Sequence, residues 1–242
     1  GGMIGFFNGN ENITFITEHF NYNTTSTVTS SSSVYMGGMI GYMYSNKNIT
    51  ITDAGTTTNG SITVFSYGPV ILGSTFGFIQ STDYFTFISS ERTNNALLSG
   101  TGYGGVDLGG FVGSLKNSKT VVLSFSQHKN SGELITQTQG APIYEGGFIG
   151  LCENNENAEV TVSKGRNNGD IKATSLYRYV GGFAGSFNNN KNTTMTISDF
   201  TNEGTIAFSQ NGISYSGGLI GSFSGNSDQT LEFETITNNG NI

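Results

Sequence analysis

Gly217-Gly218-Leu219-Ile220-Gly221 is the clearest copy of a pentapeptide, Gly-Gly-x-x-Gly, that returns along the whole chain. Further copies begin at Gly1, Gly37, Gly109, Gly146 and Gly181, and a degenerate copy, Gly73-Ser74-Thr75-Phe76-Gly77, fills the remaining place. Successive copies start 36, 36, 36, 37, 35 and 36 residues apart. A nearly constant period of this length predicts a single array of stacked repeats over residues 1–242, with the last repeat incomplete.

The pattern inside one repeat is typical of strands. When residues are counted as offsets from the first glycine, the second strand is apolar at offsets 12 and 14, as at Val121 and Leu123. Alternation of this kind has the period of a strand. An Asn-x-Gly-x-Ile turn, such as Asn202 to Ile206, precedes a third strand. The sequence therefore predicts an all-β fold, a parallel β-helix (β-solenoid) of about seven coils of ~36 residues with three short strands per coil. Offset 6 is apolar in every repeat and is assigned to the core: Phe7, Met43, Ile79, Leu115, Cys152, Phe187 and Phe223.

Offsets 3 and 4 of the pentapeptide need separate explanations. Offset 4 is always glycine, which predicts the close approach of a neighbouring backbone or side chain. Offset 3 is always apolar, although simple alternation would point it outward. Either the chain bends inward at adjacent glycines with positive φ, or these residues form an exposed stripe for lateral packing. The offset-3 residues are Ile4, Ile40, Phe76, Val112, Ile149, Ala184 and Ile220.

Composition excludes several classes of function. The chain has 36 Gly, 2 Pro and a net charge of −7, and no run of Lys or Arg that would favour a nucleic-acid partner. No apolar run approaches the roughly 20 residues of a spanning helix, so we expect no membrane insertion within this segment. The single cysteine, Cys152, cannot form an internal disulfide and is expected to be a buried thiol. Neither end shows a capping element, so we expect a segment of a longer solenoid.

No residue pattern predicts catalysis. The six Asp residues fall at six different offsets, so no carboxylate pair recurs on adjacent coils; we expect no catalytic residue and no cofactor. Glu133, Asp170 and Glu203 lie at or near offset 24 of successive coils and are the one candidate calcium site. Solvated turn residues are the favoured interpretation of that cluster. His19 and His128 show no partner and are expected on the surface or in loops.

Asn-x-Ser/Thr sequons are possible sites of glycosylation in a secreted protein. Three of them share offset 11, where the sequence predicts a turn. The candidate residues are Asn12, Asn23, Asn48, Asn59 and Asn192.

The run Gly218-Leu219-Ile220-Gly221 matches the GLUG motif, and Gly147-Phe148-Ile149-Gly150 is a near-match. With the Asn-x-Gly-x-Ile turns, the array resembles GLUG-type and related Gly-Gly-rich repeats of large bacterial and protist surface proteins and adhesins. The resemblance implies a structural or adhesive segment of an extracellular or cell-surface β-solenoid that is not an enzyme. An uncapped coil end is an open strand edge, so the expected partners are further copies, bound end-to-end or laterally, or other surface proteins and glycans. A carbohydrate-binding or carbohydrate-cleaving β-helix is the alternative.

Overall fold

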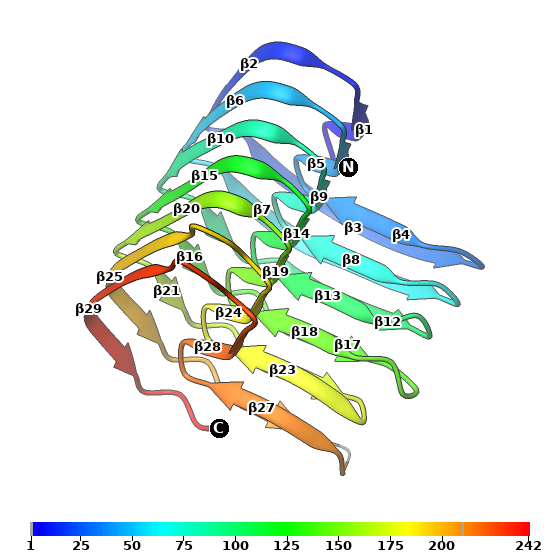
Figure 1. The fold of residues 1–242 in the computed structure, drawn as a ribbon. Helices are drawn as coiled ribbons and strands as arrows, with labels where there is room; N and C mark the ends of the chain where they lie inside the picture. The colour runs from blue at the N-terminus through cyan, green and yellow to red at the C-terminus, as the bar shows by residue number, and fades with distance from the viewer. Residues whose placement is uncertain (1, 210) are drawn as a thin grey trace.

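The chain folds as a parallel β-solenoid. The computed structural model describes residues 2–209 and 211–242, so Gly1, the start of the first repeat, lies outside the described residues. Every named element in those residues is a β-strand, and none is a helix able to cross a membrane. The strands stack as layers along one axis (Figure 1). Because six of the seven repeats close, the stack has about six complete turns, which confirms the predicted fold class with a slightly smaller number of coils.

Each coil contributes strands to four walls. The first wall holds β1 (Ile4–Asn8), β5 (Ile40–Tyr44), β9 (Phe76–Gln80), β14 (Val112–Lys116), β19 (Ile149–Glu153), β24 (Ala184–Asn188) and β28 (Ile220–Ser224). The second wall holds β2 (Glu11–Glu18), β6 (Lys47–Ala54), β10 (Asp83–Ser90), β15 (Lys119–Ser126), β20 (Glu156–Ser163), β25 (Thr194–Asn202) and β29 (Thr230–Asn238).

The third wall is made of longer strands at the N-terminal end and broken strands further along. It holds β3 (Asn21–Ser30), β7 (Thr57–Ser66), β11 (Thr93–Asn94), β12 (Leu97–Gly102), β16 (Lys129–Asn130), β17 (Leu134–Gln137), β21 (Arg166–Asn167), β22 (Ile171–Thr174) and β26 (Ile206–Phe208). The fourth wall holds β4 (Val34–Gly37), β8 (Val70–Gly73), β13 (Val106–Gly109), β18 (Ile143–Gly146), β23 (Tyr177–Gly181) and β27 (Ile213–Gly217). The sequence predicts three strands per coil, and the fourth wall is an addition, formed where the sequence indicates the end of a Ser/Thr-rich loop.

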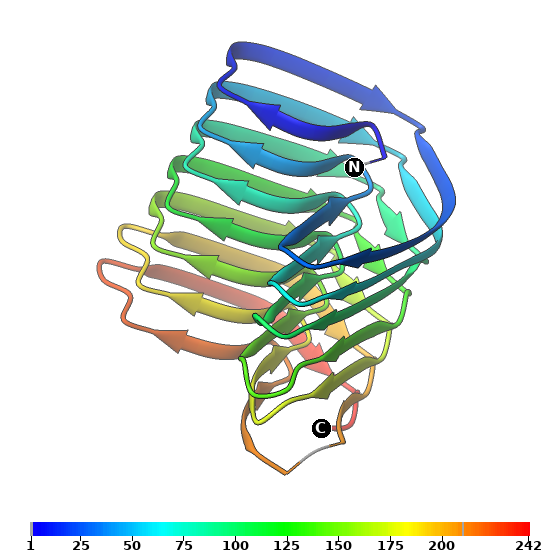
Figure 2. The same cartoon turned by 90° about the vertical axis from the view of Figure 1, so that its right-hand side faces the viewer.

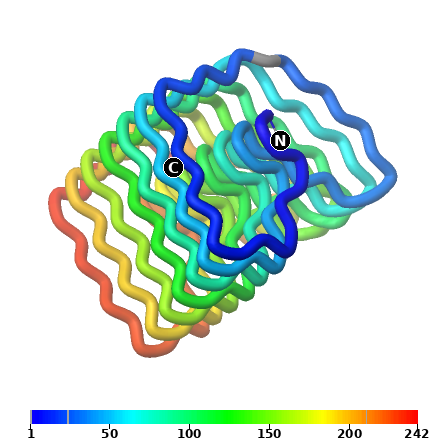
Figure 3. The backbone as a smooth tube through the Cα atoms, turned by 90° about the horizontal axis from the view of Figure 1, so that it is seen from above, coloured from blue at the N-terminus to red at the C-terminus, as the bar shows by residue number. Residues whose placement is uncertain are grey.

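All strands pair in parallel with the equivalent strands of neighbouring coils. In the fourth wall, Gly109 pairs with Gly73 on one side and with Gly146 on the other, so the repeat in the sequence is the repeat in space. The second and third walls join in one 16-stranded sheet, whereas the first and fourth walls form separate sheets of 7 and 6 strands. The coils lie above one another with the same path, as the turned views show (Figures 2 and 3).

Two apolar cores run along the stack. The larger core lies between the first and second walls and includes the phenylalanines Phe111, Phe125 and Phe148. The smaller core lies between the third and fourth walls and includes Leu98 and Leu108. The Gly-Gly pairs separate these cores, because they stand at the corner where the fourth wall turns into the first.

The glycines serve close packing rather than a left-handed backbone. A Cβ on Gly113, at offset 4, would lie 2.6 Å from the carbonyl oxygens of Gly77 and Leu72, so only glycine lets the first and fourth walls meet. The prediction of a neighbouring backbone at this column is confirmed. The expectation of positive φ at the paired glycines is wrong, since the positive-φ glycines among the described residues lie elsewhere, as at Gly105 and Gly140.

The apolar side chains at offset 3 point into the larger core. Ile40, Phe76, Val112, Ile149 and Ala184 are all buried, and those of the end coils pack against the same core. The inward bend is therefore correct, and the alternative of an exposed lateral-packing stripe is wrong. The physical reason is the tight Gly-Gly corner, which lets offsets 2 and 3 both face inward in the complete inner coils.

The two sequence signatures of the repeat meet in space. In the later coils the second glycine of the pair lies against the first Asn of the Asn-x-Gly turn in the same coil, as Gly110 does against Asn130. These asparagines form a buried ladder in which each side-chain amide donates to the carbonyl oxygen of the next. From Asn94 to Asn130 the Nδ2–Oδ1 distance is 2.7 Å, and from Asn130 to Asn167 it is 2.8 Å. The ladder satisfies polar groups that the solenoid would otherwise bury without partners.

Candidate functional site

Aromatic side chains form two ladders on the outer face of the corner between the first and fourth walls. On the first wall, Tyr42 stacks on Phe78 with ring centroids 5.2 Å apart. On the fourth wall, Tyr144 stacks on Tyr179 at 4.9 Å, and Tyr179 stacks on Tyr215 at 5.2 Å. Parallel in-register pairing places equivalent residues one above another, so a repeated aromatic becomes a ladder.

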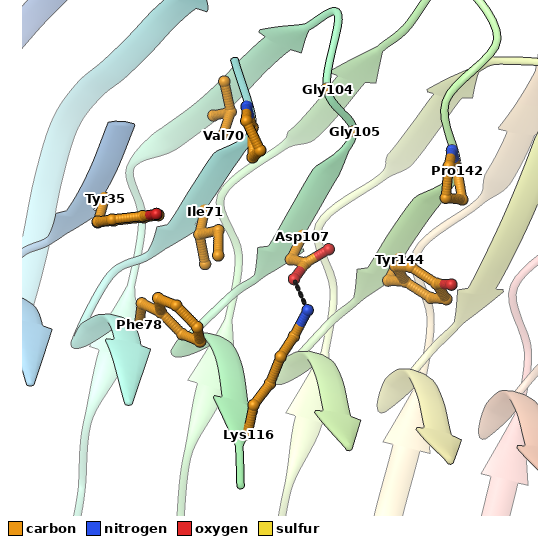
Figure 4. Close-up of a pocket in the computed structure, with 11 residues that line it drawn as sticks. Tyr35, Val70, Ile71, Phe78, Gly104, Gly105, Asp107, Lys116, Pro142 and Tyr144 are labelled. Carbon is orange, nitrogen blue, oxygen red and sulfur yellow. Dashed lines mark ion pairs between the residues drawn. The ribbon is translucent and has the colours of Figure 1, made fainter. Parts of the chain in front are cut away.

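In the middle of the stack the fourth-wall ladder is interrupted and the first-wall ladder ends. In the fourth-wall column, Ile71 and Asp107 stand between Tyr35 and Tyr144. In the first-wall column, Ser114 follows Phe78. The shorter side chains leave a hollow of about 310 Å³ between the two broken ends (Figure 4).

A charged group lies in this hollow. Lys116 Nζ is 3.2 Å from Asp107 Oδ2 and 3.7 Å from Glu153 Oε2, so one ammonium serves two carboxylates. Burial raises the pKa of Asp107 even though Lys116 acts in the opposite direction. The Lys116 ammonium also lies 6.0 Å from the centre of the Phe78 ring. Figure 4 shows Asp107 and Lys116 meeting between the two walls.

The rim of the hollow is built from residues without long side chains. Pro69, Gly105 and Pro142 precede β8, β13 and β18 at equivalent positions, and these two prolines are the only ones in the sequence. Tyr144 lies beside Pro142 at the C-terminal end of the hollow, and burial raises its pKa to about 12. Its hydroxyl therefore remains protonated at neutral pH and can both donate and accept hydrogen bonds.

The structure does not assemble the candidate calcium site. Glu133 and Asp170 occupy equivalent positions on adjacent coils, but the next coil presents Thr205 there, because Glu203 lies two residues earlier. Glu133 is paired with Lys172, and Asp170 Oδ1 accepts a hydrogen bond from the Thr205 amide at 2.9 Å. Within residues 2–209 and 211–242, no group of three or more His, Cys, Asp or Glu side chains could hold a metal ion.

The sequon asparagines lie at the surface, and four of the five are paired with one another. Asn48 Nδ2 donates to Asn12 Oδ1 at 2.6 Å, and Asn59 donates to Asn23 in the same way. Asn192 donates to Asn157, and its backbone φ is 50°. Asn59 is half-buried and the other four side chains are exposed. Glycosylation at these positions stays a prediction.

A buried polar cluster lies inside the solenoid, and the sequence does not predict it. Arg92 Nη1 is 2.7 Å from Asp53 Oδ2, and both side chains are buried. Burial raises the pKa of Asp53, but Arg92 and hydrogen bonds from Thr56 and Thr17 outweigh this and hold the pKa below 3.8. The cluster joins several coils, because Asp53 and Arg92 come from different repeats.

His128 and Cys152 are both in the interior. His128 lies in the connection between β15 and β16, as the loop part of the prediction has it, but the surface part is wrong: it packs against Phe111 and Phe125, and burial lowers its pKa to about 3. The cause is the corner between the second and third walls, which turns His128 inward, as it does Arg92 at the equivalent position of the preceding coil. His19 is exposed, as predicted. Cys152 is a buried free thiol, as predicted, and burial raises its pKa to about 12.

The hollow is the site that sequence reasoning missed. The tyrosine column containing Tyr35, Tyr144 and Tyr179 is visible in the sequence as the residue two before each Gly-Gly. The interruption of this column at Ile71 and Asp107 can also be seen in the sequence. The facing column of Phe78 comes from another wall, and only the fold brings the two together.

These features define the class of the molecule as a parallel β-solenoid repeat protein. Comparisons with protein-family models, with curated proteins and with solved structures gave no match.

Proposed function

We propose that this chain is a structural and adhesive segment of an extracellular or cell-surface β-solenoid. The observation that supports this most is the unbroken parallel pairing of every wall from coil to coil, in one register. Such a stack holds each coil to its neighbours through many backbone hydrogen bonds, so it can resist force coil by coil. The resemblance of its Gly-Gly-x-x-Gly repeats to GLUG-type surface proteins supports the same role.

The proposed partners are surface proteins, glycans and further copies of the chain. The net charge of −7 and the shortage of basic residues, 10 Lys and Arg in 242, disfavour nucleic acid. An exposed aromatic surface suits protein or glycan contacts better than polyanions. Phe65, Tyr67 and Tyr103 provide such a surface on the third-wall side, where Tyr67 and Tyr103 stack at 5.2 Å.

Location and mechanical role can be tested separately. An antibody against residues 1–242 should label intact cells of the source organism before their membranes are permeabilised. Labelling only after permeabilisation would contradict a surface location. In single-molecule pulling, the chain should extend in steps of one or a few coils, each coil releasing about 120 Å of contour length. Extension without measurable resistance would contradict the structural role.

A carbohydrate-binding module is the second candidate function. The hollow between the first and fourth walls favours it, because aromatic rings and a hydrogen-bonding ion pair converge there. Such a module is compatible with an adhesive segment, since adhesion needs a ligand.

A further inference from the structure

We propose that the hollow between Phe78 and Tyr144 is a binding site for one ring of a neutral saccharide. The proposal rests on the adhesive role proposed above and names the ligand of its adhesive face. The site lies where the two aromatic ladders break, so its position is fixed by residues 71, 107 and 114.

The apolar surfaces suit the flat face of a pyranose. The half-buried ring of Tyr144 offers an aromatic face, and Phe78, which is only 7% exposed, closes the opposite side of the hollow. Pro69 and Pro142 add two further apolar rings at the rim. Aromatic faces carry partial negative charge, which attracts the C–H groups on the apolar face of a sugar. Tyr35 and Tyr144 lie three coil spacings apart, about 14 Å along the stack. The side chains between them, Ile71 and Asp107, are shorter than tyrosine and leave the hollow above them open to a ring.

The polar groups suit the hydroxyl edge of the same ligand. Asp107 can accept hydrogen bonds and Lys116 can donate them, and the two groups lie 3.2 Å apart. Adjacent sugar hydroxyls each donate and accept, so a vicinal diol can bridge the carboxylate and the ammonium. These bonds are strengthened because Asp107 is only 8% exposed.

The charge around the hollow and its volume favour a ligand that is neutral and small. Lys116 is shared between Asp107, which lines the hollow, and Glu153 beside it, so the three groups together carry one excess negative charge. An anionic sugar would be repelled there and by the net charge of −7. A volume of about 310 Å³ is at the lower end of small-molecule sites, about 300–1,000 Å³. A hollow of this size fits a single sugar ring, so it would bind one unit of a longer saccharide.

The test is calorimetric titration of the 242-residue chain with cellotriose, xylotriose, mannotriose, galactotriose and N-acetylchitotriose. Trigalacturonate and a proline-rich nonapeptide serve as the anionic and peptide comparisons. We expect saturable binding of at least one neutral trisaccharide, with Kd of about 1 mM or tighter, and at least tenfold weaker binding of trigalacturonate. If no neutral saccharide binds, or if only the peptide does, the proposal is wrong.

Variants locate the binding. Tyr144→Ala and Lys116→Met should each weaken binding about tenfold. Tyr215→Ala is the matched control, because it removes the same ring from the same column two coils away, and its affinity should equal that of the wild type. Far-ultraviolet circular dichroism checks that each variant is folded. If Tyr144→Ala does not fold, the proposal is tested with Lys116→Met, which should weaken binding, and with Tyr144→Phe. Tyr144→Phe keeps the aromatic ring and should therefore keep the affinity.

The outcomes separate this proposal from the one on which it rests. Undiminished binding in folded Lys116→Met and Tyr144→Ala would place the saccharide elsewhere and overturn the assignment. Failure of saccharide binding would leave the surface labelling and the pulling result unchanged. Failure of those two experiments would remove the adhesive role while leaving the hollow as a sugar site.

Discussion

At Gly113 the absence of a side chain decides whether two walls can meet. A Cβ there would lie 2.6 Å from two backbone oxygens, which belong to different strands and cannot turn away as a side chain could. Gly5 occupies the same column in the first coil, and a Cβ on it would have nothing within 4 Å. One column therefore contains both a crowded glycine and a free one.

We expect Gly113→Ala to lower the free energy of unfolding by about 1–3 kcal/mol or more, because the walls must separate to admit the methyl group. Gly5→Ala is the control and should change stability by less than about 0.5 kcal/mol. Urea unfolding followed by circular dichroism measures both. Equal destabilisation by the two substitutions would contradict close packing as the reason for glycine at this column.

Glu145 is a buried carboxyl in a column otherwise lined by Leu72, Leu108 and Val180. Burial raises its pKa from 4.5 to about 8, while Thr136 donates a hydrogen bond of 2.7 Å to Oε2. The native state holds this proton up to about pH 8, whereas the unfolded chain releases it near pH 4.5. Stability from this group is therefore present below pH 4.5 and is lost as pH rises towards 8.

We expect Glu145→Gln to remove a fall of about 1.4 kcal/mol per pH unit in the free energy of unfolding between pH 4.5 and 8. The amide keeps an oxygen acceptor for Thr136 and cannot ionise. The variant should match the wild type near pH 4.5 and exceed it at pH 8, measured by urea unfolding across the range. Glu159→Gln, at an exposed position, should keep the wild-type slope. Parallel pH profiles for the wild type and Glu145→Gln would refute this explanation.

At the scale of the element, the buried asparagine ladder joins the third-wall turns of successive coils. Asn130 accepts from Asn94 and donates to Asn167, and it also donates to the carbonyl oxygen of Gly132 at 3.3 Å. Gly110 packs against the same side chain, so the ladder lies between the two cores. Each rung satisfies its neighbours, which makes the ladder a cooperative feature.

Asn130→Ala should lower the free energy of unfolding by about 1–3 kcal/mol, because the amide of Asn94 and the carbonyl of Asn167 each lose a buried partner. Asn95→Ala is the matched control in the previous coil. The Asn95 side chain is exposed and donates to the exposed side of Asn59, so its loss should cost less than about 0.5 kcal/mol. Thermal and urea unfolding compare the two. A cost at Asn95 as large as at Asn130 would contradict a special role for the buried ladder.

At the scale of the whole molecule, the repeats differ in length at one place in the coil. The loop that joins the third wall to the fourth differs in length between successive coils. It has four residues in one coil (102–105), five in the next (138–142) and three in the one after that (175–177). The walls on either side keep their pairing. The variations of 37 and 35 residues in the repeat length are thus confined to a loop at the rim.

We expect one glycine inserted between Gly140 and Ala141 to change the midpoint of thermal unfolding by only a few degrees. The same insertion between Leu123 and Ser124 in β15 should abolish cooperative unfolding, because a shift of one residue exchanges the buried and exposed faces of the strand. Circular dichroism melts distinguish the two. A folded protein with the β15 insertion would mean that register does not depend on the buried columns.

The sequence by itself determined the repeat, the strand period, the parallel stacking and the columns that face the core. A period of about 36 residues and alternating apolar positions are local facts, and identical neighbours must stack in register to bury them. The same reasoning identified Cys152 as buried and the offset-4 glycines as points of close approach.

Only the tertiary structure shows which side chains meet at the corners between the walls. The fourth wall, the buried Arg92–Asp53 pair and His128 depend on how tightly each coil turns, which no single stretch specifies. The hollow depends on two columns from different walls: one is interrupted between Tyr35 and Tyr144, and the other ends at Phe78. Their meeting is fixed by the close packing of the Gly-Gly-x-x-Gly corner, because glycines there let the first and fourth walls approach until their outer side chains face one another.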